Sequence, residues 1–431
     1  MRGDAIITLM NAAPASAQPS QLKTIVTLFV ILRVTILLLY TPQGLLNAYT
    51  DFHHYYRTAQ LSDQGFFPYV NSWSEYPPLL GYTTQAVYSA VQAVVPMGGL
   101  SDFSYQVFAR LLGAIMLMFE TGSLILLHRI AAKAWDMERA NWLGWVYSVL
   151  SVPLFYWNAS QTSNFVFFTL LALYWFMTNR RAASAVALAL GMLIKLTPVF
   201  LLGSVARFLW PTRRPIARYL LIIAVVFAVV CVPFVLLGGA SWTIASLASN
   251  VVRASWSTPW ALIDGNWGAG DVGDIPARTQ LDLAYRVYGN PPVIPPILVL
   301  AVFGLIFVWL FRRPLDQRSP AHFIWFTTLT LLLFHLWSKG WSPQWAMLIM
   351  PFLLLSFPNQ RGLGLVLIFT LLLFVEWPLS AVLQWPPLIA AAILGRTALF
   401  VVVGVMLFRK IWPPGAPLST VPLRSAEDYI P

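Results

Sequence analysis

The sequence has few charged residues and only one cysteine. Of its 431 residues, 10% are charged and 58% are apolar, whereas an ordinary soluble domain has about 25% charged residues. With 27 Lys or Arg and 16 Asp or Glu, the chain cannot cover a water-soluble surface of its size. The single cysteine, Cys231, excludes an intrachain disulfide and a cysteine-rich metal site. We therefore expect lipid to be the main solvent of this chain.

Long apolar runs are abundant instead. A helix that crosses the hydrocarbon core needs about 20 apolar residues, and about twelve runs meet or approach that length. These runs fall at about 22–40, 108–130, 140–158, 164–178, 182–195, 198–210, 216–238, 293–311, 321–337, 343–357, 362–384 and 386–409. Aromatic residues make up 15% of the chain, as expected for belts at two membrane interfaces. The predicted fold is an all-α integral membrane protein with about twelve transmembrane helices, in one polytopic domain over residues 1–431.

Basic residues predict how these helices are oriented. Two short runs, 182–195 and 198–210, are separated by Lys195-Leu196-Thr197-Pro198, and proline disfavours helix at the residue before it. If the runs are two helices, the Arg and Lys clusters between apolar runs all fall on one face, together with both termini. The positive-inside rule favours this split. It predicts a multi-pass protein with cytoplasmic termini, and it explains the net charge of +11 without a nucleic-acid partner.

This topology leaves two long segments on the non-cytoplasmic side. We call residues 41–107 the first long segment and residues 239–292 the second long segment. Loops of this length in a compact fold are usually functional. Within the first, residues 79–95 are moderately apolar and predict a helix that lies along the membrane interface.

The first long segment contains the densest polar stretch, Asp51-Phe52-His53-His54-Tyr55-Tyr56-Arg57. A carboxylate, two imidazoles, two tyrosines and an arginine at the edge of lipid suit proton transfer and polar recognition. The alternative is a polar membrane boundary, where these residue types are also common. Asp51 and His53 are also of the types that bind divalent metals, but two ligands do not complete a site. We expect no metal and no cofactor.

Other polar residues near the predicted outer surface are further candidates. They are Glu75 and Tyr76, then Arg253, Trp256 and Asp264, and finally His335, Lys339, Trp341 and Gln344. Headgroup-level tryptophans and snorkelling lysines explain part of this set without function. Polar groups at membrane depth, in contrast, usually face a cavity. Glu376 and Arg396 also lie within apolar runs, where pairing that holds the bundle together is at least as good an explanation.

Four short motifs occur in a characteristic order. They are Asp51-x-His53-x-Tyr55-Tyr56, Tyr76-Pro77-Pro78-Leu79, Lys195-Leu196-Thr197-Pro198 and Ser342-Pro343-Gln344-Trp345. In this order the chain resembles the GT-C superfamily of integral-membrane glycosyltransferases, and most of all its bacterial branch, glycosyltransferase family 87, which includes the mycobacterial PimE mannosyltransferases. The chain departs from the pattern at Trp345, where a tyrosine often follows Ser-Pro-Gln.

The resemblance implies an enzyme of the bacterial plasma membrane. It would transfer a sugar, most commonly mannose, with inversion from a polyprenyl-phosphate donor to a glycolipid or lipid-linked acceptor on the extracytoplasmic side. Asp51 maps onto the general base of the family, and His335 onto a late histidine of the same site. The implied partners are the polyprenyl-phosphate sugar donor, the acceptor and membrane lipids.

The residues fit this chemistry independently. A sugar hydroxyl needs a base, and a positioned carboxylate contributes about 10²- to 10⁴-fold. The departing lipid phosphate needs cations. Candidates to bind it are Lys195, Lys339, Arg253 and Arg57; candidates to bind the substrates are His53, His54, Tyr55, Glu75, Tyr76, Trp256, Asp264, Trp341 and Gln344. The alternative is a lipid or glycolipid transporter or flippase, but its polar residues should not concentrate in loops on one side.

Overall fold

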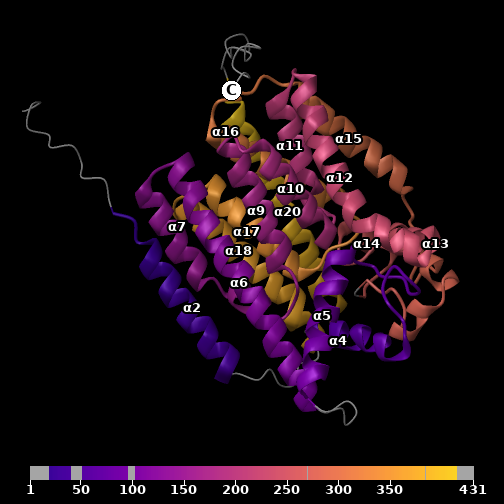
Figure 1. Cartoon of the computed structure of the whole chain (residues 1–431). Coiled ribbons are helices and arrows are strands. Elements are labelled where there is room, and N and C mark those ends of the chain that lie inside the picture. Colours follow the sequence, from indigo (N-terminus) through magenta and orange to yellow (C-terminus); the bar gives the residue numbers. More distant parts are fainter. Residues whose placement is uncertain (1–18, 40–50, 96–101, 269, 384, 415–431) are drawn as a thin grey trace, which may run out of the picture.

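The computed structural model describes residues 19–39, 51–95, 102–268, 270–383 and 385–414, and every regular element within these ranges is a helix (Figure 1). The first half contains α2 (Leu22–Leu39), α4 (Asp51–Ala59), η1 (Gln60–Gln64), α5 (Pro78–Val94), α6 (Asp102–Ala134), α7 (Met137–Val149), α8 (Ser151–Tyr156), α9 (Ser163–Met177), α10 (Arg181–Ile194), η2 (Thr197–Val199) and α11 (Phe200–Leu209). The second half contains α12 (Arg213–Gly238), α13 (Ala240–Val252), α14 (Pro259–Asp264), η3 (Ile275–Thr279), η4 (Asp282–Tyr285), α15 (Pro296–Arg312), α16 (Pro320–Trp337), η5 (Pro343–Trp345), α17 (Ala346–Ser356), α18 (Gln360–Phe374), the π-helical η6 (Val375–Leu379), α19 (Ser380–Leu383) and α20 (Pro386–Ile411).

Six of these helical stretches are long and apolar enough to cross a membrane. They are Leu22–Leu39, Phe103–Ala134, Arg213–Gly238, Pro320–Trp337, Gln360–Leu379 and Pro386–Ile411. The shorter apolar helices include α9, α10 and α15. The prediction of an all-α fold with helices able to span a membrane is thus confirmed for the described residues. The helices fall within or close to the predicted apolar runs. The total of about twelve spans and their assignment to a membrane side stay predictions.

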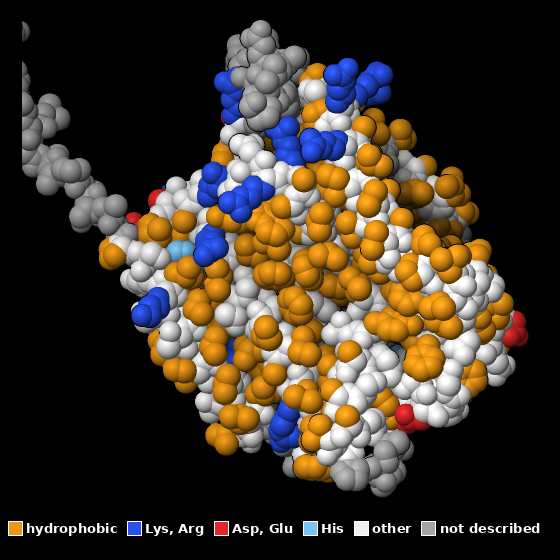
Figure 2. Space-filling model, in the orientation of Figure 1, with side chains coloured by type: hydrophobic (Ala, Val, Ile, Leu, Met, Phe, Trp, Pro, Cys, Tyr) orange, Lys and Arg blue, Asp and Glu red, His pale blue; other side chains and the backbone are white. Residues whose placement is uncertain are grey.

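The packing is that of a bundle with a buried centre and an apolar exterior. All 11 residues of α17 are buried. On α12, in contrast, Leu221, Val229 and Leu236 are 62%, 69% and 79% exposed. Apolar side chains cover much of the visible surface in Figure 2. Apolar surface this extensive is rare on a soluble monomer and marks contact with lipid or a partner.

The chain reverses direction between α10 and α11. Lys195, the residue after α10, has extended backbone angles, so the helix cannot continue through it. The ring of Phe323 packs against Phe208 near the end of α11 and against Phe176 near the end of α9. The end of α11 therefore returns to the level at which α9 ends and α10 begins. This confirms the predicted split into two helices with Lys195 at their junction.

Basic side chains gather at one end of the bundle (Figure 2). They cluster in the upper part of the view, where α11 ends and α12 begins. The residues near the ends of the helices there include Arg207, Arg213, Arg214, Arg218, Arg312, Arg313, Arg318, Arg409 and Lys410. The two long segments lie toward the opposite end, where α4, α5, α13 and α14 are found (Figure 1). Both chain termini, predicted to be cytoplasmic, lie outside the described residues.

Candidate active site

A cavity of about 1000 Å³ lies between the two long segments and the connection from α16 to α17. Its wall brings together ten of the predicted site residues: Asp51, Glu75, Tyr76, Lys195, Arg253, Trp256, Asp264, Lys339, Trp341 and Gln344. These positions are spread over almost 300 residues of sequence from Asp51 to Gln344, a separation of 293. The fold, and no local motif, assembles them.

Asp51 begins α4 and presents its carboxylate to this cavity. Its backbone N–H donates to the carbonyl of Ala159 at 2.9 Å. The Tyr55 hydroxyl and the Gln344 amide donate to Oδ2 at 3.3 and 3.2 Å. Among the described residues, none donates to Oδ1. Burial raises the pKa of the Asp51 carboxyl, and nearby His54 and Lys195 oppose this rise. One carboxylate oxygen is therefore held while the other is open to accept a proton.

Lys195 brings its amino group beside Asp51; burial lowers the pKa of Lys195 to about 7, and the Asp51 carboxylate opposes this fall. Its ammonium lies 4.4 Å from the centre of the Trp345 ring and 5.4 Å from that of Phe165. Within the described part of the chain, no hydrogen bond or ion pair engages this ammonium. A cation held by aromatic faces keeps its three N–H donors for a ligand.

The other two cations on the wall also contact the protein. The Lys339 ammonium donates to the carbonyl of Val251 at 2.7 Å and also to that of Arg253. Burial lowers the pKa of Lys339 to about 8. Arg253 donates to the carbonyl of Gly270, and its guanidinium lies 4.1 Å from the centre of the Trp256 ring. Both residues give the wall positive charge. Lys339 keeps few donors for a ligand, whereas the Arg253 Nε has no hydrogen-bond partner among the described residues.

A short backbone bridge joins the segment that carries Arg253 to the segment that carries Lys339. Trp256 N–H donates to the Lys339 carbonyl at 3.0 Å, and Trp341 N–H donates to the Trp256 carbonyl at 3.1 Å. Gly340 lies between them, and a Cβ there would overlap the Trp256 ring. The two cation-bearing segments are therefore one structural unit.

Trp341 is also supported from the bundle side. The Arg396 guanidinium lies 4.3 Å from the centre of its ring and pairs with the buried carboxylate of Glu376. Both charged residues lie within apolar runs, and the pairing expected for them is present. The pair backs the cavity wall; neither residue lines it.

Five predicted residues do not line the cavity: His53, His54, Tyr55, Arg57 and His335. The side chains of His53 and Arg57 are exposed elsewhere on α4. His335 is 6% exposed and lies among the rings of Trp341, Trp345 and Phe400. Neither of its ring nitrogens has a hydrogen-bond partner among the described residues. The structure thus places His335 one layer behind the wall that contains Trp341 and Trp345.

Asp264 lines the cavity, but its carboxylate is occupied. The Ser255 hydroxyl donates to Oδ2 at 2.6 Å, and the backbone N–H of Val293 donates to Oδ1 at 2.7 Å. These bonds connect α14 to the chain that leads into α15. The geometry assigns Asp264 to holding the second long segment together, where the sequence predicted substrate binding.

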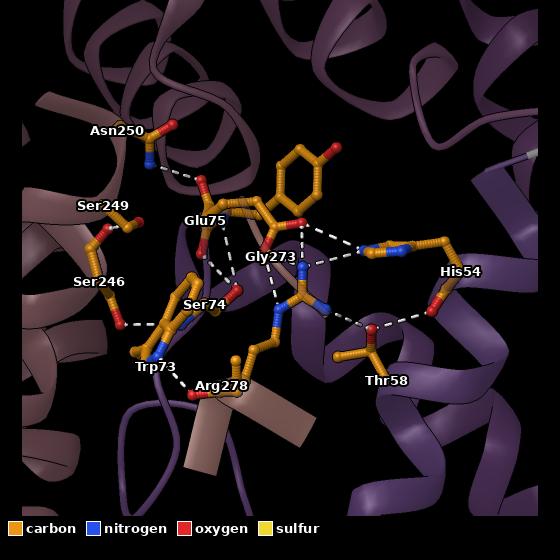
Figure 3. Close-up of polar contacts among 12 residues, drawn as sticks. His54, Thr58, Trp73, Ser74, Glu75, Ser246, Ser249, Asn250, Gly273 and Arg278 are labelled. Atoms are coloured by element: carbon orange, nitrogen blue, oxygen red, sulfur yellow. Dashed lines mark hydrogen bonds and ion pairs between the residues drawn. The ribbon is translucent and has the colours of Figure 1, made fainter. Parts of the chain in front are cut away.

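Glu75 is likewise committed, to a residue that the sequence did not single out (Figure 3). Its carboxylate accepts a hydrogen bond from Arg278 at 2.7 Å and lies 3.2 Å from the His54 ring nitrogen. Arg278 is 1% exposed. An isolated arginine between Ala277 and Thr279 forms no recognisable motif, and only the folded chain shows its partner.

No family model matches this chain, and no curated protein matches its sequence significantly. Across the described ranges, no group of three or more His, Cys, Asp or Glu side chains comes close enough together to hold a metal ion. The function of the cavity must therefore be inferred from its own geometry and from the four motifs.

Proposed function

We propose that the chain is an inverting, polyprenyl-phosphate-dependent glycosyltransferase. In this proposal it moves a sugar, mannose, to a lipid-linked or glycolipid acceptor on the extracytoplasmic side of the plasma membrane. One observation carries the proposal: Asp51, with one open carboxylate oxygen, and the uncommitted ammonium of Lys195 line the same cavity. The order of the GT-C-like motifs supports it, because each of the four contributes a residue to this wall.

The proposed reaction is a single displacement. Asp51 Oδ1 accepts the proton of the acceptor hydroxyl, and the hydroxyl oxygen bonds to the anomeric carbon of the donor sugar. The bond from that carbon to the phosphate oxygen breaks, and its electron pair leaves with the polyprenyl phosphate. Lys195 meets the phosphate, whose charge-assisted hydrogen bonds are the strong kind. One displacement at the anomeric carbon inverts its configuration, so no covalent intermediate on the protein is required.

The mouth of the cavity suits the lipid part of such a donor. Leu247 and Val251 of α13 and Ile263 of α14 line the cavity and are 52%, 76% and 48% exposed, and we infer from this exposure that they form its mouth. The face of α13 toward the protein carries the buried Ser246 and Ser249 instead. A helix with polar residues inward and apolar residues outward is stable only against lipid or another apolar surface. The mouth is therefore suited to a substrate that arrives from the bilayer.

The test is a transfer assay with purified protein in lipid bilayers. It uses radiolabelled polyprenyl-phosphate-mannose and a bacterial lipid extract, and it compares wild type with Asp51→Asn. We expect Asp51→Asn to lower turnover by about 10²- to 10⁴-fold, because the base is lost. Asp63→Asn is the matched control, since Asp63 lies in the same long segment, accepts from Tyr88 at 2.6 Å and does not line the cavity. Equal transfer by wild type and Asp51→Asn, or no transfer with any polyprenyl donor, would refute the proposal.

A further inference from the structure

We propose that Glu75, Arg278 and His54 form a positioning cluster that aims Asp51 at the cavity and fixes it relative to the cations of the second long segment. This inference rests on the proposed function, because it assigns the cluster a task in the same reaction. None of the three residues is proposed to bind the substrate.

The cluster joins three segments that are distant in sequence (Figure 3). Arg278, in η3, donates from Nη2 to both Glu75 oxygens at 2.7 Å and from Nε to one of them at 3.1 Å. The His54 ring nitrogen, on α4, lies 3.1 Å from the same guanidinium and 3.2 Å from Glu75. Glu75 precedes α5. The carboxylate that the sequence offers as a substrate ligand is thus used within the protein.

On α4 the cluster holds the face that carries Asp51. His54 follows Asp51 by three residues and Thr58 follows His54 by four, and residues at these spacings share one side of a helix. Arg278 Nη1 lies 3.4 Å from the Thr58 hydroxyl, which donates to the His54 carbonyl at 2.9 Å. Two contacts one turn apart prevent α4 from rotating about its axis. The direction of the Asp51 carboxylate is fixed with it.

The same cluster docks the segment that carries the cations. The Asn250 amide donates to the backbone carbonyl of Glu75 at 2.7 Å. Arg253 follows Asn250 by three residues, and its backbone carbonyl accepts from Lys339. Trp73 N–H donates to the carbonyl of Arg278 at 3.0 Å. The helix that carries the base and the segment that carries the cations therefore both pack against the same buried Glu75–Arg278 ion pair.

The cluster also sets the charge near Asp51. Burial alone would raise the pKa of Glu75, but Arg278 and His54 hold it well below its usual range, so Glu75 stays ionised. The negative charge of Glu75 in turn raises the pKa of Asp51. The titratable groups that face Asp51 are His54 and Tyr55 of α4, Glu75 and Tyr76 before α5, Tyr156 of α8 and Lys195 after α10.

The signs of the expected pH effects follow from these charges. In Glu75→Gln the negative charge is lost, so the pKa of Asp51 falls and the acid limb of the kcat profile moves to lower pH. In Arg278→Lys the positive charge beside Glu75 is kept, so Glu75 stays ionised and the acid limb does not move to lower pH. A general loosening of the fold would hydrate Asp51 and lower its pKa. The acid limb would then move to lower pH in both Glu75→Gln and Arg278→Lys. The contrast between the two variants therefore separates positioning and charge from mere loosening.

The kinetic test compares Glu75→Gln, Arg278→Met and Arg278→Lys with wild type in the transfer assay. We expect kcat to fall about 10²-fold in Glu75→Gln and Arg278→Met, because a displaced catalytic group can cost that much, while KM for the donor changes less than about three-fold. Arg278→Lys keeps the charge and should recover part of the loss. Arg286→Met is the matched control, since Arg286 lies in the same segment against Tyr288. A rise in KM with unchanged kcat, or equal acid-limb shifts in Glu75→Gln and Arg278→Lys, would overturn the inference.

A measurement without substrate keeps this inference separate from the proposed function. Spin labels at Arg57→Cys on α4 and Asp282→Cys in η4, both exposed positions, in a Cys231→Ser background report the distance between the two segments. We expect one narrow distance distribution that broadens in Arg278→Met and is restored in part by Arg278→Lys. An unchanged distribution in Arg278→Met overturns the inference even if the wild type is an active transferase. If the wild type shows no transferase activity with any polyprenyl donor and the distribution still broadens in Arg278→Met, the proposed function alone is refuted.

Discussion

The two ends of the cavity differ in how they use their side chains. At the inner end, Asp51 and Lys195 each keep polar atoms open while surrounding residues hold them in place. At the mouth, Leu247, Val251 and Ile263 contribute exposed apolar surface. The difference indicates a ligand that is charged or polar at one end and apolar at the other. It also predicts that inner-end variants change turnover, whereas mouth variants change how well long lipid substrates bind.

The largest effect on turnover is expected from a substitution of Lys195, at the inner end of the cavity. We expect Lys195→Met to lower kcat/KM about 10- to 100-fold, because hydrogen bonds to charged groups are worth about 1.5–3 kcal/mol. Lys133→Met, an exposed lysine near the end of α6, should leave kcat/KM unchanged. The measurement is steady-state transfer at several donor concentrations. Unchanged kinetics in Lys195→Met would show that another group receives the phosphate.

Substitutions at the mouth should raise KM for the donor and leave kcat unchanged. We expect Leu247→Ser with Val251→Ser to raise KM for a long polyprenyl donor about three- to ten-fold, since each removes apolar contact worth about 0.8 kcal/mol per buried CH₂. KM for a short-chain donor should stay the same. Ile244→Ser is the control, because Ile244 is 55% exposed on α13 but does not line the cavity. Equal effects on short and long donors would contradict lipid entry at this mouth.

The smallest effect is expected from His335→Phe, because His335 lies behind the wall. If it supports Trp341 and Trp345, His335→Phe should fill the same space and lose less than about ten-fold in kcat. His335→Ala leaves a void beside both rings and should lose more. A proton-transferring histidine would instead lose about 10²- to 10⁴-fold in either variant. Comparing kcat for the two substitutions tells these roles apart.

The sequence predicted the helices well because length and apolarity are local properties. The break at Lys195 was also predictable, from a proline and from the distribution of basic residues. The helix over Asp51–Ala59 was not predicted, because its short polar sequence has no apolar run. Sequence spacing alone therefore identified Asp51 but gave no information on the helix that carries it.

The site was predictable in its residue types and not in its pairings. Asp51, Lys195 and Gln344, which the sequence singled out as candidates, line one cavity, but their proposed roles stay predictions. The commitments of Glu75 to Arg278 and of Asp264 to Val293 depend on contacts across more than one segment, and single residues in loops carry no sign of them. His335 illustrates a second limit. Because α16 is apolar on all sides, its sequence does not indicate which face meets the cavity.

The junction at Lys195 sets the depth at which a lipid phosphate would be met. Helix α10 has 14 residues, which at about 1.5 Å per residue span about 21 Å, less than the hydrocarbon thickness of about 30 Å. If α10 starts at the basic surface, its far end stops short of the opposite interface. The headgroup would then have to descend below its resting level to reach Lys195. We expect the bilayer beside the mouth to be thinned, so that transfer depends on membrane thickness as well as on substrate structure.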